Sequence, residues 1–283
     1  MARASAPASS ANLGPAFDAM AVAIDLRCVV EAQPAAVWSV EHVGPEAPGP
    51  GADDAVLIAA QYAVGKDRPL ALSVDNPIPL GRGLGSSSAA FAAGVLAAWR
   101  AVDETHSVER LFEVVAHLEG HPDNAAAAVY GGLVLVTGTG AVVRLPWHPN
   151  LRLAVAVPDR PFATKEARGV LPSAYPADVV VRSISRTAAL VAGLMSSDAA
   201  LLRAAGGDEL HESPRSALRP ELSGLVDAAL GAGALHACWS GAGPSVLAIG
   251  PVEGIGAVAE AMRLRLADEG HVIEPLVATT GAA

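Results

Sequence analysis

A run of alternating glycines followed by serines, at residues 81–88, has the composition of a phosphate-binding loop. Gly81, Gly83 and Gly85 stand at every second position, and the serines open an apolar stretch that predicts a helix over 85–100. Glycine lets the backbone approach an anion closely, and a helix N-terminus offers unpaired N–H groups and partial positive charge. The spacing matches neither the Walker A motif nor the dinucleotide fingerprint. The residues alone leave two interpretations, a phosphate cradle and a tight turn that begins a helix.

A second dense polar group, EGHPDN, occupies residues 119–124 after a predicted helix over 107–118. Glu119 is suited to Mg²⁺, which takes a few protein oxygens and keeps its other positions for water and phosphate, and Ser87 is a suitable second ligand. The alternative is an ordinary turn, in which Pro122 ends one helix and Asp123 caps the next. HPDN taken alone favours that turn.

Two further loops combine glycine with polar side chains. SSANLGPAFD, residues 9–18, joins the first two predicted strands, and WSGAGPS, residues 239–245, lies between two strands near the C-terminus. A polar loop of the first kind suits a small ligand. Taken alone, the first is a wide connection and the second a hairpin that needs glycine for positive φ.

Hydrophobic periodicity predicts the elements that must position these loops. Before residue 147 it indicates strands at 20–33, 69–75, 133–137 and 142–145, helices at 53–64, 85–100, 107–118 and 123–131, and a loop over 45–51. After the turn WHPN, residues 147–150, it indicates strands at 151–157, 235–239, 244–249 and 271–278 and helices at 163–171, 176–205, 220–230 and 254–267. We expect two α+β lobes that meet near this turn.

Composition limits the partners and the compartment. The chain has 283 residues, 52% hydrophobic and 17% charged, which argues against a disordered chain. A formal net charge of -10, with no Lys/Arg cluster, leaves nothing to neutralise a nucleic-acid backbone. Cys28 and Cys238 are far apart, so we expect two core thiols. Because neither an apolar signal-peptide stretch nor a run of about 18 apolar residues occurs, we expect a cytoplasmic protein with no membrane partner.

Together these loops resemble the motifs of the GHMP kinase superfamily. PASSANLGPAFD, PLGRGLGSSSAA and SGAGPS match its three motifs in order, so the resemblance spans nearly the whole chain. SANLGPAFD together with EGHPDN is similar to the homoserine kinases rather than to the mevalonate or galactose enzymes. The resemblance implies an α+β, two-lobe GHMP kinase fold. Residues 1–147 would form a ribosomal protein S5 domain 2-like lobe with the phosphate loop, and residues 148–283 a ferredoxin-like lobe.

The resemblance implies an ATP-dependent small-molecule kinase, which transfers the γ-phosphate of ATP to the side-chain hydroxyl of L-homoserine in threonine biosynthesis. Ser87 and Glu119 would hold Mg²⁺. ATP would bind at Pro79, Leu80, Gly81, Arg82, Gly83, Leu84, Gly85, Ser86, Ser87, Ser88 and Ala89. L-homoserine would bind at Asn12, Asp18, His121, Asp123, Thr164, Arg168 and Arg215.

The two arginines suit the substrate carboxylate, because a guanidinium group can grip two oxygens at once. Asp18 or Asp123 would complement the substrate ammonium group. The family likeness also implies a homodimer. We expect the adenine neighbourhood at 53–58, and we expect the methyl group of Ala16, which stands where the family pattern usually has glycine, to narrow the substrate pocket.

Catalytic roles are implied for Asn12, His121 and Asn124. Asn124 stands where mevalonate-type relatives carry a candidate base, and an amide cannot accept a proton at neutral pH. Our hypothesis is that Asn12 or Asn124 orients the substrate hydroxyl while its proton passes to solvent or to phosphate. Two alternatives stay open, a GHMP kinase for another small alcohol and a catalytically silent relative that binds nucleotide.

Overall fold

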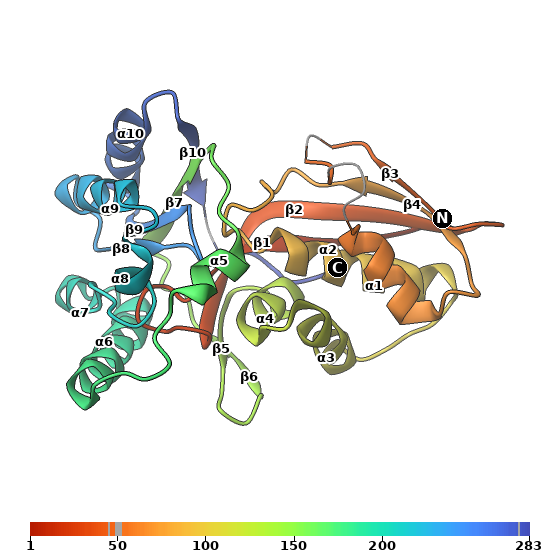
Figure 1. The fold of residues 1–283 in the computed structure, drawn as a ribbon, viewed down its shortest axis with the longest axis horizontal. Coiled ribbons are helices and arrows are strands. Elements are labelled where there is room, and N and C mark those ends of the chain that lie inside the picture. Colours follow the sequence, from red (N-terminus) through yellow and green to blue (C-terminus); the bar gives the residue numbers. More distant parts are fainter. Residues whose placement is uncertain (45, 49–52, 277) are drawn as a thin grey trace.

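The computed structural model describes residues 1–44, 46–48, 53–276 and 278–283 and consists of two lobes (Figure 1). The predicted loop over 45–51 lies in large part outside the described residues. The first lobe contains β1 (Ala2–Ala11), β2 (Met20–Pro34), β3 (Ser39–His42), α1 (Ala55–Val64), β4 (Leu70–Asp75), α2 (Ser86–Ala101), α3 (Val108–Glu119), α4 (Pro122–Tyr130), β5 (Leu133–Val136) and β6 (Val142–Leu145). The second lobe contains β7 (Leu151–Pro158), α5 (Thr164–Gly169), α6 (Ala177–Ser196), α7 (Ala199–Ala204), α8 (Glu212–Arg215), α9 (Glu221–Gly231), β8 (His236–Trp239), β9 (Val246–Pro251), α10 (Ile255–Leu266) and β10 (Gly270–Leu276).

A long strand organises the first sheet. β2 is rich in β-branched and apolar residues, which favour extended backbone. It pairs with β1 along most of its length and, on its other edge, with β4 through residues 29–34 and with β5 through residues 20–22. The order is β3-β4-β2-β5-β6, with β1 beside β2. Helix α2 packs on β1 and β2, while α1 and α3 pack on α2 (Figure 1).

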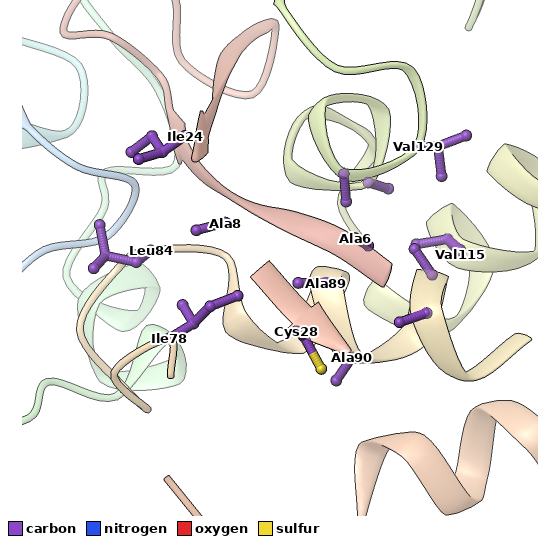
Figure 2. Close-up of a cluster of buried hydrophobic side chains, with 14 of the residues drawn as sticks. Ala6, Ala8, Ile24, Cys28, Ile78, Leu84, Ala89, Ala90, Val115 and Val129 are labelled. Atoms are coloured by element: carbon purple, nitrogen blue, oxygen red, sulfur yellow. The ribbon is translucent and has the colours of Figure 1, made fainter. Parts of the chain in front are cut away.

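Alanine and glycine bring α2 close to the sheet and to α1. Figure 2 shows Ala89 of α2 in the same buried cluster as Ala6 of β1 and Cys28 of β2. Small side chains let the backbones approach, and a Cβ at Gly94 of α2 would lie only 3.1 Å from the carbonyl oxygen of Val56 in α1. Dense packing therefore fixes the helix whose N-terminus carries the glycine-rich loop.

The second sheet has the order β10-β7-β9-β8, and each neighbouring pair is antiparallel. Helices lie between β7 and β8 and between β9 and β10, and α9 and α10 pack together on the sheet (Figure 1). This connectivity is the ferredoxin-like arrangement predicted for the second lobe, and the predicted α+β two-lobe fold is confirmed. Cys28 and Cys238 are buried, free cysteines, as predicted.

Several elements differ from the sequence-based expectation. The single helix predicted over 176–205 is wrong: Ser197 adopts the left-handed conformation and ends α6, and Asp198 caps α7 by accepting the N–H groups of Ala200 and Leu201. The short strand β3, parallel to β4, and the four-residue helix α8 were not predicted. Ala16 does not narrow the substrate pocket, because its methyl group is buried in the core of the first lobe.

The last residues of the chain return to the first lobe. Ala278 forms a bridge with Ile24 of β2, and the carbonyl oxygen of Ala283 accepts a hydrogen bond of 2.7 Å from the backbone N–H of Ser5 in β1. Figure 1 accordingly shows the C-terminus beside the helices of the first lobe. Assigning all of 148–283 to the second lobe is therefore wrong for residues 278–283, while the boundary near residue 147 stays a prediction.

Candidate active site

A cleft is lined by residues of both lobes. From the first lobe it takes residues 79–87 of the glycine-rich loop, Glu119 at the end of α3 and the start of α4, and from the second lobe Gly241 and Ala242. All seven predicted substrate residues line it: Asn12, Asp18, His121, Asp123, Thr164, Arg168 and Arg215. Asp53 to Val56 of the expected adenine neighbourhood also line the cleft, whereas Ser88 and Ala89 are buried behind it. The fold thus gathers segments that are far apart in the sequence.

The glycine-rich loop is held against the turn at residues 239–245. Its three glycines all have positive φ, between 63° and 73°. A Cβ at Gly83 would lie 2.7 Å from the carbonyl oxygen of Gly243 and closer still to that of Ser240. The Ser240 hydroxyl donates to the carbonyl oxygen of Gly83 at 2.6 Å. The second glycine turn therefore supports the first.

The first serine of the loop has a structural role. The Ser86 hydroxyl donates to the carbonyl oxygen of Ile78 at 3.2 Å and accepts from the side-chain amide of Asn76 at 3.0 Å. The Asn76 amide oxygen in turn accepts the N–H of Ile78 at 3.1 Å. This network anchors the start of the loop, and it leaves Ser87 as the exposed hydroxyl at the helix N-terminus.

Ser87 and Glu119, predicted to bind Mg²⁺ together, lie side by side. The Ser87 hydroxyl donates to Oε1 of Glu119 at 2.9 Å, and Oε2 of Glu119 is buried with no hydrogen-bond partner among the described residues. Burial raises the pKa of Glu119 to about 7, against the opposing effect of the Ser87 and Ser88 hydroxyls. An unpartnered buried carboxylate oxygen is an unfavourable arrangement that a bound cation would relieve, so these residues fit a magnesium ion.

No cluster of three or more His, Cys, Asp or Glu side chains suited to a metal occurs within residues 1–44, 46–48, 53–276 and 278–283. Mg²⁺ needs no such cluster when phosphate oxygens and water complete its shell. The pair formed by Ser87 and Glu119 is consistent with this mode of binding.

The start of α4 presents three predicted residues to the cleft. Burial raises the pKa of Asp123 to about 6, although its carboxylate accepts the N–H of Asn124 at 2.8 Å, a contact that favours the ionised form. Burial, and then the charge of Arg168, lower the pKa of His121. The Ser9 hydroxyl donates to Oδ1 of Asn124 at 2.8 Å. With its oxygen engaged, Asn124 keeps its amide N–H groups for another acceptor.

Asn12 is held differently. It is buried with a φ of +69°, its Oδ1 accepts the N–H of Asp18 at 3.0 Å, and its Nδ2 donates to the carbonyl oxygen of Gly241 at 2.8 Å. Both polar atoms of the side chain are therefore occupied within the protein. Asn12 closes the loop at residues 12–18 and ties it to the second lobe.

A clasp between the lobes crosses the cleft. Arg168 of α5 donates to both carboxylate oxygens of Asp18, at 2.6 and 3.1 Å. The two side chains are about one-third exposed, so an ion pair of this kind contributes only about 1 kcal/mol. Arg168, predicted to bind a carboxylate, thus pairs with Asp18, predicted to bind an ammonium group. Little free energy is needed to separate the two side chains.

The second predicted arginine is buried and fixed. Arg215 of α8 donates from Nε to the carbonyl oxygen of Ala167 at 2.9 Å and from Nη1 to Nδ1 of His211 at 2.9 Å. His211 in turn donates from Nε2 to the carbonyl oxygen of Gly14 at 2.7 Å. Burial and the nearby charge of Arg168 lower the pKa of Arg215 to about 10, so it stays positively charged at neutral pH.

Sequence reasoning missed the residues that support the site. Ser9 and Asn76 anchor Asn124 and the glycine-rich loop, and His211 aims Arg215. A signal was present for Asn76, since an Asn-Pro pair just before a glycine-rich loop is typical of a structured turn. Ser9 opens the polar segment singled out at residues 9–18, but it lies within β1, and nothing in the sequence indicated its contact with Asn124.

Comparison with known proteins agrees with this geometry. Residues 53–132 match the family model described as GHMP kinases N terminal domain, and residues 187–268 match GHMP kinases C terminal. A homoserine kinase from Thermus thermophilus is 41% identical over 248 residues, covering 86% of this chain and 85% of that protein. One from Gloeobacter violaceus is 39% identical over 277 residues, 90% of each chain. The solved homoserine kinase from Cytophaga hutchinsonii has a TM-score of 0.87 at 28% identity, covering 100% of this chain and 96% of that chain.

The fold, the glycine-rich loop and these matches define an ATP-dependent kinase of the GHMP superfamily. Mevalonate kinase from L. major, at 16% identity and a TM-score of 0.72, shares the fold alone. The relatives with high identity over most of their length are homoserine kinases, and the chain belongs to the homoserine kinase family. The resemblance drawn from the sequence motifs is confirmed.

Proposed function

We propose that this chain transfers the γ-phosphate of ATP to the side-chain hydroxyl of L-homoserine with Mg²⁺. The bond from the γ-phosphorus to the bridging oxygen of the β-phosphate breaks, and a bond from the homoserine oxygen to that phosphorus forms. The hydroxyl proton is released. The products are ADP and O-phospho-L-homoserine, an intermediate of threonine biosynthesis.

The ion pair of Asp18 with Arg168 carries the assignment of the substrate. An amino acid is a zwitterion, and its ammonium and carboxylate groups can replace this pair with two new ones, one to Asp18 and one to Arg168. Arg215, held 2.9 Å from the carbonyl oxygen of Ala167 and from Nδ1 of His211, adds a second positive charge for the carboxylate. A neutral alcohol offers neither charge, so it would leave the clasp closed.

Positioning and charge stabilisation by the chain's own groups would accelerate the transfer. Residues of the glycine-rich loop and of the first turn of α2 line the cleft, and their backbone N–H groups would hold the phosphates. Ser87 and Glu119 would hold Mg²⁺, which would offset the negative charge that develops during the transfer.

We infer that Asn124, rather than Asn12, orients the substrate hydroxyl. Both polar atoms of the Asn12 side chain have protein partners, whereas Ser9 engages only the oxygen of Asn124. A hydrogen bond from Asn124 Nδ2 to the hydroxyl oxygen would fix its direction of attack. Because Asn124 then acts as a donor, the proton leaves toward solvent or phosphate, with His121 beside it at the start of α4.

An ATP-consumption assay with Mg²⁺ tests this function. L-homoserine is compared with mevalonate, galactose, shikimate and L-serine, and the phosphorylated product is confirmed by mass. We expect strong preference for L-homoserine. Turnover of a different alcohol would keep the kinase and refute the substrate, while nucleotide binding without turnover of any alcohol would favour the silent relative.

Helix α6 is 20 residues long and contains an 18-residue window with a mean hydropathy of 1.3, so it is long and apolar enough to cross a membrane by length and composition alone. It nevertheless carries Arg182 and Arg186, both paired with Glu209 at 2.6 to 2.9 Å, and its Thr187 hydroxyl donates to the carbonyl oxygen of Pro15 at 2.9 Å. These contacts make α6 part of the folded lobe. The cytoplasmic location stays a prediction.

We propose that a second copy of the chain covers the exposed face of α6. Val181 and Ile184 are 63% and 64% exposed, and Met195 is 43% exposed. The exposed positions 181, 184, 188, 192 and 195 are spaced symmetrically about Ala188. A twofold axis at Ala188 would place Val181 against Met195 and Ile184 against the small Ala192, which is the self-complementarity that a C2 interface needs.

Sedimentation velocity tests the homodimer. We expect the wild-type protein to sediment as a dimer and Ile184→Glu as a monomer. Leu264→Glu, at a position of α10 that is 73% exposed, is the matched control and should leave the dimer intact. A monomeric wild-type protein would refute the proposal.

A further inference from the structure

Phe17 is an apolar residue in the middle of the polar loop at residues 12–18. Its ring stacks on the imidazole of His211, with centroids 5.0 Å apart and planes inclined by 23°. The guanidinium carbon atoms of Arg168 and Arg215 lie 5.4 and 5.6 Å from the same ring centroid. One half-buried side chain therefore contacts both arginines of the cleft and the histidine that aims one of them.

Two positive groups that share one ring need an arrangement that offsets their repulsion. The face of an aromatic ring carries negative potential and attracts a guanidinium group. Nε of Arg168 is buried with no hydrogen-bond partner among the described residues, so the Asp18 pair leaves that part of the group unsatisfied. The ring of Phe17, 5.4 Å from the guanidinium carbon of Arg168, offers this unsatisfied part of the group a surface of negative potential.

The ring also has a fixed position relative to the cleft. Phe17 directly precedes Asp18, whose N–H is held by Asn12, and the stacked His211 donates to the carbonyl oxygen of Gly14 in the same loop. The loop thus presents a carboxylate and an aromatic face side by side. Arg168 of the second lobe contacts both.

We propose that Phe17 is a positioning residue for substrate selection, holding the guanidinium groups of Arg168 and Arg215 so that they converge on the carboxylate of an amino-acid substrate. This inference rests on the proposed function. When the substrate ammonium group displaces Arg168 from Asp18, the ring keeps Arg168 beside Arg215. Without the ring, the freed guanidinium would lose the contact that keeps it near a group of the same charge.

The test compares Phe17→Leu with Phe17→Tyr. Leucine keeps an apolar side chain and removes the aromatic face, whereas tyrosine keeps the face. We expect Phe17→Leu to raise the KM for L-homoserine, and its Kd measured by calorimetry, about tenfold, as expected for loss of contacts to two partly desolvated guanidinium groups. The KM for ATP should not change, and Phe17→Tyr should behave like the wild-type protein.

A substrate analogue separates positioning from general loss of structure. Wild-type protein should discriminate strongly against the carboxamide of L-homoserine, which lacks the carboxylate charge, and Phe17→Leu should lose most of that discrimination. Phe112→Leu is the matched control, because Phe112 is also half-buried and packs on one aromatic ring, Tyr130, at 5.7 Å but contacts no cation among the described residues. It should leave both KM values unchanged.

The outcomes distinguish the two proposals. Failure of the wild-type protein to bind and phosphorylate L-homoserine would overturn the proposed function and this inference with it. If the wild-type protein is active, the inference alone is overturned by either of two results. One is a Phe17→Leu protein with normal KM for L-homoserine. The other is a Phe17→Leu protein whose KM rises by the same factor for L-homoserine, for ATP and for the carboxamide.

Discussion

Replacing Gly83 by alanine should separate the two reasons for a glycine in the phosphate loop, its backbone conformation and its close approach to the neighbouring turn. The φ of Gly83 is +73°, a region that costs an L-residue about 1–2 kcal/mol. The added methyl group would also lie 2.7 Å from the carbonyl oxygen of Gly243, where ordinary contacts begin at 3.4 Å. Since the opposing atoms are backbone, no side-chain rotation can relieve the overlap.

Gly81→Ala is the control for conformation alone. Gly81 has a similar φ of +65°, and a methyl group added there would have Cβ of Pro161 as its nearest neighbour, at an ordinary 3.4 Å. We expect Gly81→Ala to lower the free energy of unfolding by about 1–2 kcal/mol. Gly83→Ala should lose a further ~1–3 kcal/mol, the usual cost of overpacking, because the loop must separate from Ser240 and Gly243.

Thermal unfolding and ATP kinetics measure both effects. Displacing Gly83 would break the hydrogen bond from the Ser240 hydroxyl to its carbonyl oxygen and move the backbone N–H groups that we propose hold the phosphates. The KM for ATP should therefore rise by about tenfold or more in Gly83→Ala relative to Gly81→Ala, a change of at least ~1.4 kcal/mol. Equal stability and equal KM in the two variants would refute the role assigned to the turn.

Three further substitutions test the orienting amide, the metal ligand and a buried carboxyl group. Asn124→Ala should lower kcat by about tenfold or more with little change in the KM for L-homoserine, and full activity would contradict the orienting role. Glu119→Gln should lower kcat/KM by about 100-fold and raise the Mg²⁺ concentration for half-maximal rate, and an unchanged Mg²⁺ titration would contradict the metal role. Glu212 is buried, which raises its pKa to about 8, so its contribution to stability is present below pH 4.5 and is lost as pH rises through 8. Glu212→Gln should abolish this fall in the free energy of unfolding, measured at intervals from about pH 5 to pH 9.

The sequence predicts the parts of the site that depend on local chemistry. Alternating glycines before a serine-rich apolar stretch predict a loop at a helix N-terminus, and the structure has α2 beginning at Ser86 with Gly85 in the left-handed conformation. Position in the family motifs also places Ser87 beside Glu119, 32 residues away, and the structure brings them within 2.9 Å. In such cases a short segment holds most of the information.

Tertiary contacts decide the rest. Asp18 and Arg168 are 150 residues apart, and only the docking of α5 against the loop before β2 makes them a pair. The strand β3 has four residues and gains its conformation from parallel pairing with β4, which no alternation within the segment reveals. The break between α6 and α7 did have a local signal, since Asp198 before an apolar run is a typical helix cap.

In the proposed function, the clasp between Asp18 and Arg168 would link binding of the substrate to its selection. Separating this pair costs about 1 kcal/mol, because both groups are partly exposed. Binding of an amino acid would contribute more free energy than that, because its ammonium and carboxylate groups would each form a new charged contact. A hydroxy acid such as mevalonate would occupy the arginines but leave Asp18 without a cation, in a cleft that also contains the buried carboxyl group of Asp123. Selection against such alcohols would then come from the unpaired carboxylate as much as from the contacts made to homoserine.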